Sequence, residues 1–363
     1  MPGTADPVNV GDYEALAREC MERGAFDYYA GAACDEQTHR ENRLALDRLR
    51  LRPRMLVDVS RIDTGVTVLG TVISMPVMLA PTALNRLAHP DGELAAARAA
   101  GAAGTLMVAS CVSTYAMEEI ASAANGPLWF QLYVCRDRDL TRNLVERAAA
   151  AGYLALVITV DTPLLGKRER DVRNSFGVPK GLSLSNFEPK SSAVNAEPTW
   201  RVDPSFAAHA DSLFDPSITW DEISWLRSLT RMPVIVKGIL TPEDARLALA
   251  AGVAGIIVSN HGGRQLDGVE AAINALPAVV EAVGSDCEVF MDGGIRRGSD
   301  VLKALALGAR AVLIGRSYLW GLAVGGEKGV RHVLELLRGE LELAMGLSGR
   351  PTIASIDRSL VHK

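Results

Sequence analysis

One stretch of the chain joins a buried strand directly to reactive side chains: Gly255-Ile256-Ile257-Val258-Ser259-Asn260-His261-Gly262-Gly263-Arg264-Gln265-Leu266-Asp267-Gly268. Its first residues form a short apolar run, which is typical of a parallel strand buried on both faces. Histidine is the side chain that ordinarily exchanges a proton near neutral pH, so His261 can accept one, and Arg264 is a fixed cation suited to a carboxylate. The stretch therefore indicates chemistry at a carbon next to a carboxylate. A surface loop that carries one histidine and one arginine is the alternative.

Apolar runs of the same kind recur along the chain and alternate with Ala-rich helical patterns. The runs begin at Pro76, Gly104, Leu128, Ala155, Pro233, Gly255, Cys287 and Ala311. Helices are predicted over residues 91–102, 115–124, 138–151, 219–230, 241–251, 270–283, 299–308 and about 325–345. Eight such units predict an α/β fold, a (β/α)8 TIM barrel. A doubly wound sheet could hold as many strands, but it does not predict polar residues after nearly every one.

The rest of the chain is predicted to frame this barrel within a single domain of residues 1–363. Residues 1–60 have helical spacing and form an N-terminal helical extension, and the barrel covers residues 76–345. The gap between the fourth and fifth strands is much longer than the others. It holds residues 166–216, which are rich in Ser, Asn, Pro and Lys and are predicted to form a long, lid-like loop after strand 4.

Composition excludes several classes of protein. The 363 residues are 48% hydrophobic and 22% charged, as in a globular protein, and a net charge of -5 gives no sign of a nucleic-acid surface. The five cysteines form no C-x-x-C pair, so neither a metal site nor a disulfide framework is indicated. No signal region or membrane-length apolar run is present, and we expect a cytoplasmic protein with no membrane association.

Polar residues follow almost every predicted strand. In a barrel the carboxyl ends of the strands converge on one site, so these side chains are expected to meet. In chain order they are Pro81, Thr82 and Ala83; Ser110; Gln131 and Tyr133; Thr159 and Asp161; Lys237; Ser259, His261 and Arg264; Asp292, Gly293 and Gly294; and Gly315 and Arg316. Folding alone does not require so many polar groups at one end of a barrel.

The last two strand ends have the pattern of a phosphate site. Asp292-Gly293-Gly294-Ile295-Arg296-Arg297-Gly298-Ser299 offers free backbone N–H groups and cations near a helix start, and Ile314-Gly315-Arg316-Ser317 offers a second set. Loops after strands seven and eight of barrels recurrently bind phosphate.

Taken with these strand ends, the motif Ser-Asn-His-Gly-Gly-Arg-Gln-Leu-Asp at residues 259–267 resembles the signature of the FMN-dependent 2-hydroxy-acid oxidase and dehydrogenase family. The resemblance extends from about Tyr13 to about Leu347. It implies that FMN is the cofactor, and no G-x-G-x-x-G fingerprint argues for NAD instead. The implied FMN contacts are Pro81, Thr82, Ala83, Ser110, Gln131, Thr159, Lys237, Ser259, Asp292, Gly293, Gly294, Arg296, Gly315 and Arg316.

The resemblance also implies roles in catalysis for residues at the strand ends. His261 would accept a proton, with Asp161 pairing with its ring, and Lys237 would stabilise negative charge on the reduced flavin. The remaining implied substrate contacts are Tyr28, Arg168 and Arg264 at the carboxylate and Tyr133 at the hydroxyl. Whether His261 removes the carbon proton or the hydroxyl proton cannot be decided from residue types.

Three positions depart from the family pattern or divide its members. Many members have Arg where this chain has Leu164, which we interpret as peripheral because the following Lys167-Arg168 retains the charge. Glycolate-type enzymes have a bulky Trp where this chain has Val112, which predicts room for a larger substrate. Mandelate dehydrogenases have Gly where this chain has Ala83, which favours O2 as the acceptor.

The predicted function is therefore that of an FMN-dependent (S)-2-hydroxy-acid oxidase. Its expected substrate is aromatic, such as mandelate or 4-hydroxymandelate, and its expected assembly is a homotetramer, by analogy with the family. A lactate or glycolate oxidase and a mandelate dehydrogenase with another acceptor stay open. So do a different FMN barrel, related to isopentenyl diphosphate isomerase or inosine monophosphate dehydrogenase, and a non-catalytic flavin- or phosphate-binding barrel.

Overall fold

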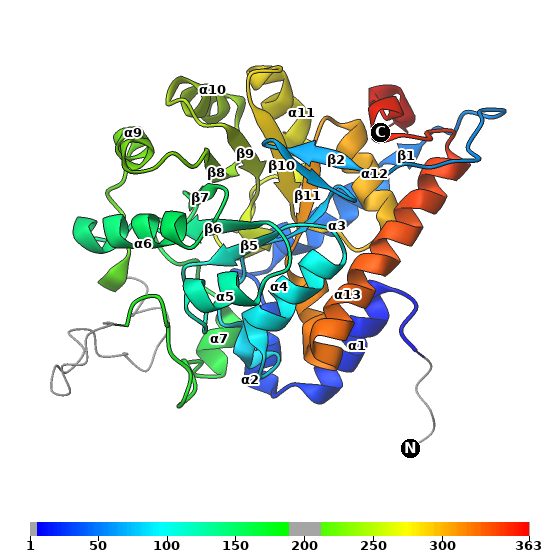
Figure 1. Ribbon diagram of the computed structural model, residues 1–363. Helices are drawn as coiled ribbons and strands as arrows, with labels where there is room; N and C mark the ends of the chain where they lie inside the picture. The colour runs from blue at the N-terminus through cyan, green and yellow to red at the C-terminus, as the bar shows by residue number, and fades with distance from the viewer. Residues whose placement is uncertain (1–5, 189–211, 363) are drawn as a thin grey trace, which may run out of the picture.

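The centre of the molecule is a closed barrel of eight parallel strands (Figure 1), in the order β10-β11-β4-β5-β6-β7-β8-β9. The structure is a computed structural model, and it describes residues 6–188 and 212–362. The predicted α/β barrel is confirmed, since each predicted apolar run contains one barrel strand. These strands are β4 (Val77–Leu79), β5 (Met107–Ser110), β6 (Leu128–Leu132), β7 (Leu156–Thr159), β8 (Val234–Ile239), β9 (Gly255–Val258), β10 (Glu288–Asp292) and β11 (Ala311–Ile314).

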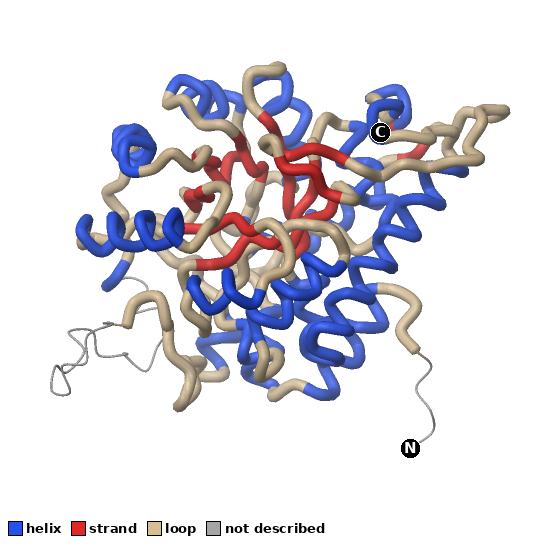
Figure 2. Tube along the Cα trace, viewed as in Figure 1, coloured by secondary structure: helices blue, strands red, loops and turns tan. Residues whose placement is uncertain are grey.

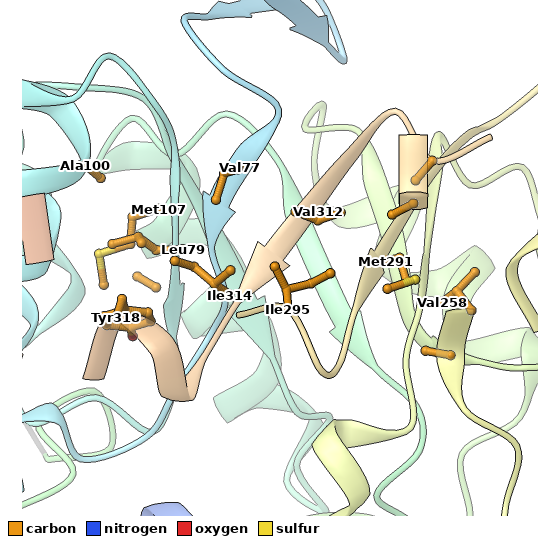
Figure 3. Packing of buried hydrophobic residues seen from close by; sticks show 14 of the residues in the cluster. Val77, Leu79, Ala100, Met107, Val258, Met291, Ile295, Val312, Ile314 and Tyr318 are labelled. Carbon is orange, nitrogen blue, oxygen red and sulfur yellow. The ribbon is translucent and has the colours of Figure 1, made fainter. Parts of the chain in front are cut away.

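Successive residues of the barrel strands point alternately into the barrel and out toward the helices. In β6, Trp129 belongs to the cluster that fills the barrel, whereas its neighbour Phe130 belongs to the cluster between strands and helices. The ring of Trp129 packs edge-on against Phe290 of β10, with centroids 5.5 Å apart. Figure 3 shows part of the outer cluster, in which Leu79 and Ile314 pair across adjacent strands. Both faces of each strand are buried, which explains the continuous apolar runs.

A β-hairpin that the sequence analysis did not predict closes one end of the barrel. Its strands, β2 (Val66–Val68) and β3 (Thr71–Ile73), pair antiparallel, and their apolar side chains join the cluster inside the barrel. The turn donates the Leu69 backbone N–H to the carboxylate of Glu288, the first residue of β10, at 3.0 Å. The hairpin therefore lies at the amino ends of the strands, and the carboxyl ends are left for a binding site.

Helices form the outer layer around the barrel (Figure 2). Seven of the eight predicted helices are confirmed to within a few residues at each end. Short 3-10 turns lie in the loops. The helices are α4 (Gly92–Ala102), α5 (Met117–Ala123), α6 (Arg138–Ala150), α9 (Trp220–Leu229), α10 (Pro242–Ala250), α11 (Ala272–Val283) and α12 (Gly298–Ala306), followed by α13 (Arg316–Leu347). The turns are η1 (Asn85–Leu87), η2 (His261–Gly263), η3 (Ile353–Ser355) and η4 (Arg358–Leu360).

The last helix differs from its prediction, which began near residue 325. Helix α13 already starts at Arg316, directly after β11. The backbone leaves helical geometry at Gly325 and Gly326, where Gly326 has a φ of +55°. This glycine pair is the reason that the sequence pattern marks only the part of the helix beyond the kink.

The N-terminal extension packs on the barrel as three helices, α1 (Val10–Cys20), α2 (Arg23–Ala30) and α3 (Gln37–Arg48). Helix α1 lies beside α13 (Figure 1), and the Tyr13 hydroxyl is hydrogen-bonded to His332 Nδ1 at 2.8 Å. After α3, β1 (Arg50–Leu51) pairs with β12 (Val361–His362), at the far end of α13 from α1 (Figure 1).

The loop after β7 contains a short helix, α7 (Glu169–Arg173). Residues 189–211 of the predicted lid-like loop lie outside the described residues. The assignment of residues 1–363 to a single domain stays a prediction. Among the residues described, none of the helices combines the length and the apolar character that crossing a membrane would require.

Candidate active site

One pocket opens at the carboxyl ends of the strands, and nearly all the predicted site residues line it. These are Tyr28, Pro81, Thr82, Ala83, Ser110, Gln131, Tyr133, Thr159, Arg168, Lys237, His261, Arg264, Asp292, Gly293, Gly294, Arg296, Gly315 and Arg316. The two other predicted residues, Asp161 and Ser259, lie behind this lining and hydrogen-bond to members of it.

His261 and Asp161 form a half-buried pair at the ends of β9 and β7. Their Nδ1 and Oδ1 atoms are 2.8 Å apart, so the neutral ring carries its proton on Nδ1 and leaves Nε2 as the acceptor. Burial, with the nearby Lys237 ammonium, lowers the pKa of His261 despite the opposing effect of Asp161. Burial would raise the pKa of Asp161, but the interactions with His261 and with the Lys237 ammonium outweigh it and lower that pKa. The resting pair is therefore a neutral imidazole beside a carboxylate.

The backbone on both sides of this pair adopts positive φ angles. His261 has a φ of +57°, in the left-handed region that non-glycine residues rarely adopt, and its N–H donates to Ser259 Oγ at 3.0 Å. On the other side, Gly238 has a φ of +114°, and a Cβ at this position would lie 2.6 Å from the Cβ of Asp161. Glycine at 238 therefore allows the carboxylate to reach the histidine.

Lys237 is a buried cation held by two neighbouring strands. Its Nζ lies 3.2 Å from Asp292 Oδ2 and donates to Ser259 Oγ at 2.9 Å, while Ser259 Oγ donates to Asp292 Oδ1 at 2.7 Å. Burial would lower the pKa of Lys237, but the carboxylates of Asp292 and Asp161 raise it. The pocket therefore retains a positive charge near the histidine.

Arg264 lies between the N-terminal extension and the pocket. Its guanidinium donates to the Gly31 carbonyl at 2.9 Å and lies 5.0 Å from the centre of the Tyr28 ring. That ring stacks on Phe176, with centroids 4.4 Å apart. These contacts fix Tyr28 and Arg264 together at the pocket wall.

Arg168 adds a second guanidinium to the same region. The residue is 6% exposed, and its Nε has no hydrogen-bond partner among the residues described. Burial and the charge of Arg264 lower the pKa of Arg168 to about 10, so it stays protonated at neutral pH. A buried cation with an unsatisfied donor beside another cation favours a bound anion.

Tyr133 and a row of polar groups complete the walls. Burial and the nearby Asp161 raise the pKa of Tyr133, so its phenol remains a hydrogen-bond donor. Ser110 Oγ donates to Gln131 Oε1 at 2.9 Å, and Gln131 Nε2 donates to Thr159 Oγ1 at 3.1 Å. The bonds link β5, β6 and β7 and hold these polar groups in fixed positions at one edge of the pocket.

The opposite end of the pocket is an anion receptor. Gly293 and Gly294 have φ values of +100° and +80°, which expose backbone at the end of β10. Arg296 and Arg316 line this end, and burial is the main cause that lowers both of their pKa values. Arg316 donates to the carbonyls of Tyr29 and Gly31, each at 2.8 Å. Two half-buried guanidiniums and glycine backbone fit the phosphate of FMN.

Several pocket residues were not predicted from the sequence. Leu164 lines the pocket although it is 68% exposed, so it lies at the mouth and is less peripheral than interpreted. Phe214 lies next to the Tyr133 ring, with centroids 4.6 Å apart. It follows a segment of weak periodicity, and no sequence signal marks it. The other additions are Tyr29, Arg136, Thr162, Pro163, Leu165, Pro216, Gly262, Ile295, Leu313, Ile314 and Leu319, together with Ala80. Val112, where the sequence predicts room for a larger substrate, lines the pocket as well.

Known proteins resemble this chain along its whole length. It is 50% identical over 366 residues to an L-lactate oxidase of Nostoc sp., with 100% of both chains covered. It is 51% identical over 357 residues to glycolate oxidase 3 of Oryza sativa subsp. indica, covering 97% of this chain and 95% of the relative. A crystal structure of a mandelate oxidase has a TM-score of 0.90 and 44% identity, with 98% of each chain covered. Another, with (S)-4-hydroxymandelic acid, has a TM-score of 0.91 and 43% identity, again over 98% of each chain.

The family model for FMN-dependent dehydrogenases matches residues 17–363. The match includes every predicted site residue and agrees with the fit of the pocket to FMN. This chain is therefore an oxidoreductase that belongs to the FMN-dependent dehydrogenase family.

Proposed function

We propose that this enzyme oxidises a 2-hydroxy acid to the corresponding 2-oxo acid. The observation that carries the proposal is a neutral histidine, paired with a carboxylate, in one pocket with two guanidiniums, of which Arg168 is buried and Arg264 is half-buried. A base and a carboxylate receptor together select a substrate whose reacting carbon is next to its carboxylate. The hydroxyl and its carbon each lose a hydrogen, and two electrons leave the substrate.

In the proposed complex Arg264, Arg168 and Tyr28 bind the substrate carboxylate. His261 accepts a proton at Nε2, and the ionised Asp161 stabilises the imidazolium that results. Tyr133 donates a hydrogen bond to the substrate oxygen as it becomes a carbonyl. The hydrogen bonds and ring contacts that fix His261, Arg264 and Tyr28 support this assignment, because a fixed site loses little energy to reorganisation.

FMN supplies the two-electron acceptor when it is bound. We assign its phosphate to Arg296, Arg316 and the glycine backbone at the ends of β10 and β11. Lys237, paired with Asp292, would stabilise negative charge at the flavin ring. The remaining proposed contacts are Pro81, Thr82, Ala83, Ser110, Gln131, Thr159, Ser259, Gly293, Gly294 and Gly315.

An aromatic substrate such as mandelate or 4-hydroxymandelate is supported by the apolar side of the pocket. Val112, Leu164, Leu165 and Phe214 all line it, and the solved mandelate oxidases have the same fold over almost the whole chain. A small substrate is the second candidate, because identity to the lactate and glycolate oxidases is higher, at 50% and 51%. The names of these relatives as oxidases, together with Ala83, support O2 as the electron acceptor and H2O2 as the second product.

An anaerobic titration of the purified protein tests the proposal. We expect a yellow protein whose flavin absorbance is bleached by (S)-mandelate and restored by air. Stronger bleaching by lactate or glycolate would favour the second candidate, and no recovery in air would make the enzyme a dehydrogenase with another acceptor. Absence of bleaching by any 2-hydroxy acid would refute the proposed reaction. The homotetramer and the cytoplasmic location stay predictions, which sedimentation and cell fractionation test.

A further inference from the structure

The chain returns to the pocket mouth just before α9 and pairs with the end of β6. Cys135 and Phe214 form an isolated antiparallel bridge. On one side of it the Arg136 N–H donates to the Leu213 carbonyl at 3.0 Å, and on the other the Asp215 N–H donates to the Val134 carbonyl at 2.9 Å. Backbone bonds on both sides therefore fix the position of Phe214.

A charged clamp holds the same turn from outside the pocket. Arg138, the first residue of α6, donates to Asp215 Oδ2 and to the Cys135 carbonyl, each at 2.6 Å, so it ties together both strands of the bridge. Hydrogen bonds from Ser217, and then Arg138, lower the pKa of Asp215 to about 2. The Asp215 carboxylate therefore stays ionised at neutral pH and keeps its ion pair with Arg138.

This clamped turn presents the Phe214 ring to the pocket. The ring contacts Tyr133 at a centroid distance of 4.6 Å and an interplanar angle of 38°, and Phe187 at 6.4 Å and 61°. Phe214 lines the same pocket as His261 and Val112. A half-buried aromatic ring beside the tyrosine that we assign to the substrate oxygen is suited to contact the substituent on the adjacent carbon.

We propose that Phe214 determines specificity by contacting a flat, apolar substituent on the carbon that bears the substrate hydroxyl, and that Arg138 positions it through Asp215. The inference rests on the proposed function and names a further feature of its substrate, a planar side chain. Phe214 touches substrate in this arrangement, whereas Arg138 acts only through the turn.

Steady-state oxidation of (S)-mandelate and (S)-lactate by the FMN-loaded enzyme tests the role of Phe214. Loss of an aromatic contact with its buried area predicts that Phe214→Ala lowers the ratio of kcat/KM for mandelate to that for lactate about tenfold, mainly through KM. Phe214→Tyr should retain the ratio to within about threefold, because it keeps the ring. An unchanged or increased ratio in Phe214→Ala, or a wild type that does not oxidise mandelate, would overturn the inference.

The clamp is tested with Arg138→Leu, with Arg138→Lys as the conservative variant and Arg142→Leu as a control on the same helix. We expect Arg138→Leu to lower the mandelate-to-lactate ratio as Phe214→Ala does, Arg138→Lys to restore part of it, and Arg142→Leu to leave it unchanged. Adding Arg138→Leu to Phe214→Ala should lower the ratio no further. Equal losses for both acids, or fully additive losses, would overturn the positioning role. A wild-type enzyme whose flavin is reduced by neither acid would instead refute the proposed function itself.

Discussion

Replacing Asp161 with Asn removes the charge behind His261 with little change in shape. The carboxylate is packed against Gly238, where a Cβ would lie 2.6 Å away, so an isosteric side chain is needed. Asp161 Oδ1 is 2.8 Å from His261 Nδ1, and Oδ2 has no hydrogen-bond partner among the residues described. The substitution therefore tests the electrostatic role of the carboxylate more directly than it tests packing.

The distance between the two groups sets the expected magnitude. At an effective dielectric constant of about 20, unit charges 2.8 Å apart attract by about 6 kcal/mol, most of which desolvation offsets. A hydrogen bond to a charged partner is worth about 1.5–3 kcal/mol net. We therefore expect Asp161→Asn to slow flavin reduction by roughly 10- to 150-fold. Without the carboxylate the imidazolium is less stable, so the pKa of His261 falls further and the acid limb of kcat/KM moves to lower pH.

Stopped-flow reduction of the flavin by substrate under anaerobic conditions measures this rate from pH 5 to 9. FMN content, read from visible absorbance, should equal that of the wild type. Thr162→Val is the matched control, since Thr162 also donates to Asp161 Oδ1, at 3.0 Å, but leaves its charge intact. A reduction rate for Asp161→Asn within about threefold of wild type, or an acid limb displaced to higher pH, would refute the assigned role.

Three further substitutions give outcomes of different kinds. Arg168→Met should raise KM for the 2-hydroxy acid by about 100-fold, because a cation that binds the substrate carboxylate is lost. It should also raise the Tm of the substrate-free protein, because it removes a buried cation with an unsatisfied donor. A lower Tm would contradict that account. Val112→Trp should fill the apolar side of the pocket and abolish mandelate oxidation while glycolate oxidation persists, as steady-state kinetics would reveal. Phe290→Ala, inside the barrel at 0% exposure, should lower the free energy of unfolding in urea by about 3–5 kcal/mol, and a loss below 1 kcal/mol would contradict the packing described.

The barrel could be predicted from the sequence because its strands are buried on both faces. A run such as Gly255-Ile256-Ile257 needs no partner to be recognised as a buried strand. The β2–β3 hairpin lacked such a signal, since each strand has only three residues and a single buried face. Likewise, the start of α13 was missed because Gly325 and Gly326 interrupt the helical pattern.

Some site residues could be predicted from local sequence, and others depend on contacts between distant parts of the chain. Lys237 lies near the carboxyl end of β8 and Asp292 is the last residue of β10, so the fold class alone brings them together. Phe214 reaches the pocket only because its backbone pairs with Cys135, nearly eighty residues earlier in the chain. Such a pairing depends on tertiary contacts that no local pattern of residues encodes. For the same reason Arg138 appeared in the sequence only as an ordinary helix residue.

The carbonyls at the end of α2 are shared between the two ends of the pocket. Arg264 and Arg316 both donate to the Gly31 carbonyl, at 2.9 Å and 2.8 Å. Deleting the N-terminal helices would remove every carbonyl acceptor of Arg264 and leave Arg316 with the Gly262 carbonyl alone, at a cost that adds to that of the lost helical contacts. The N-terminal extension is thus part of the pocket wall, and we expect the barrel alone not to form a working active site. Attempts to shorten or circularly permute this chain must keep the residues around Gly31 joined to their two arginines.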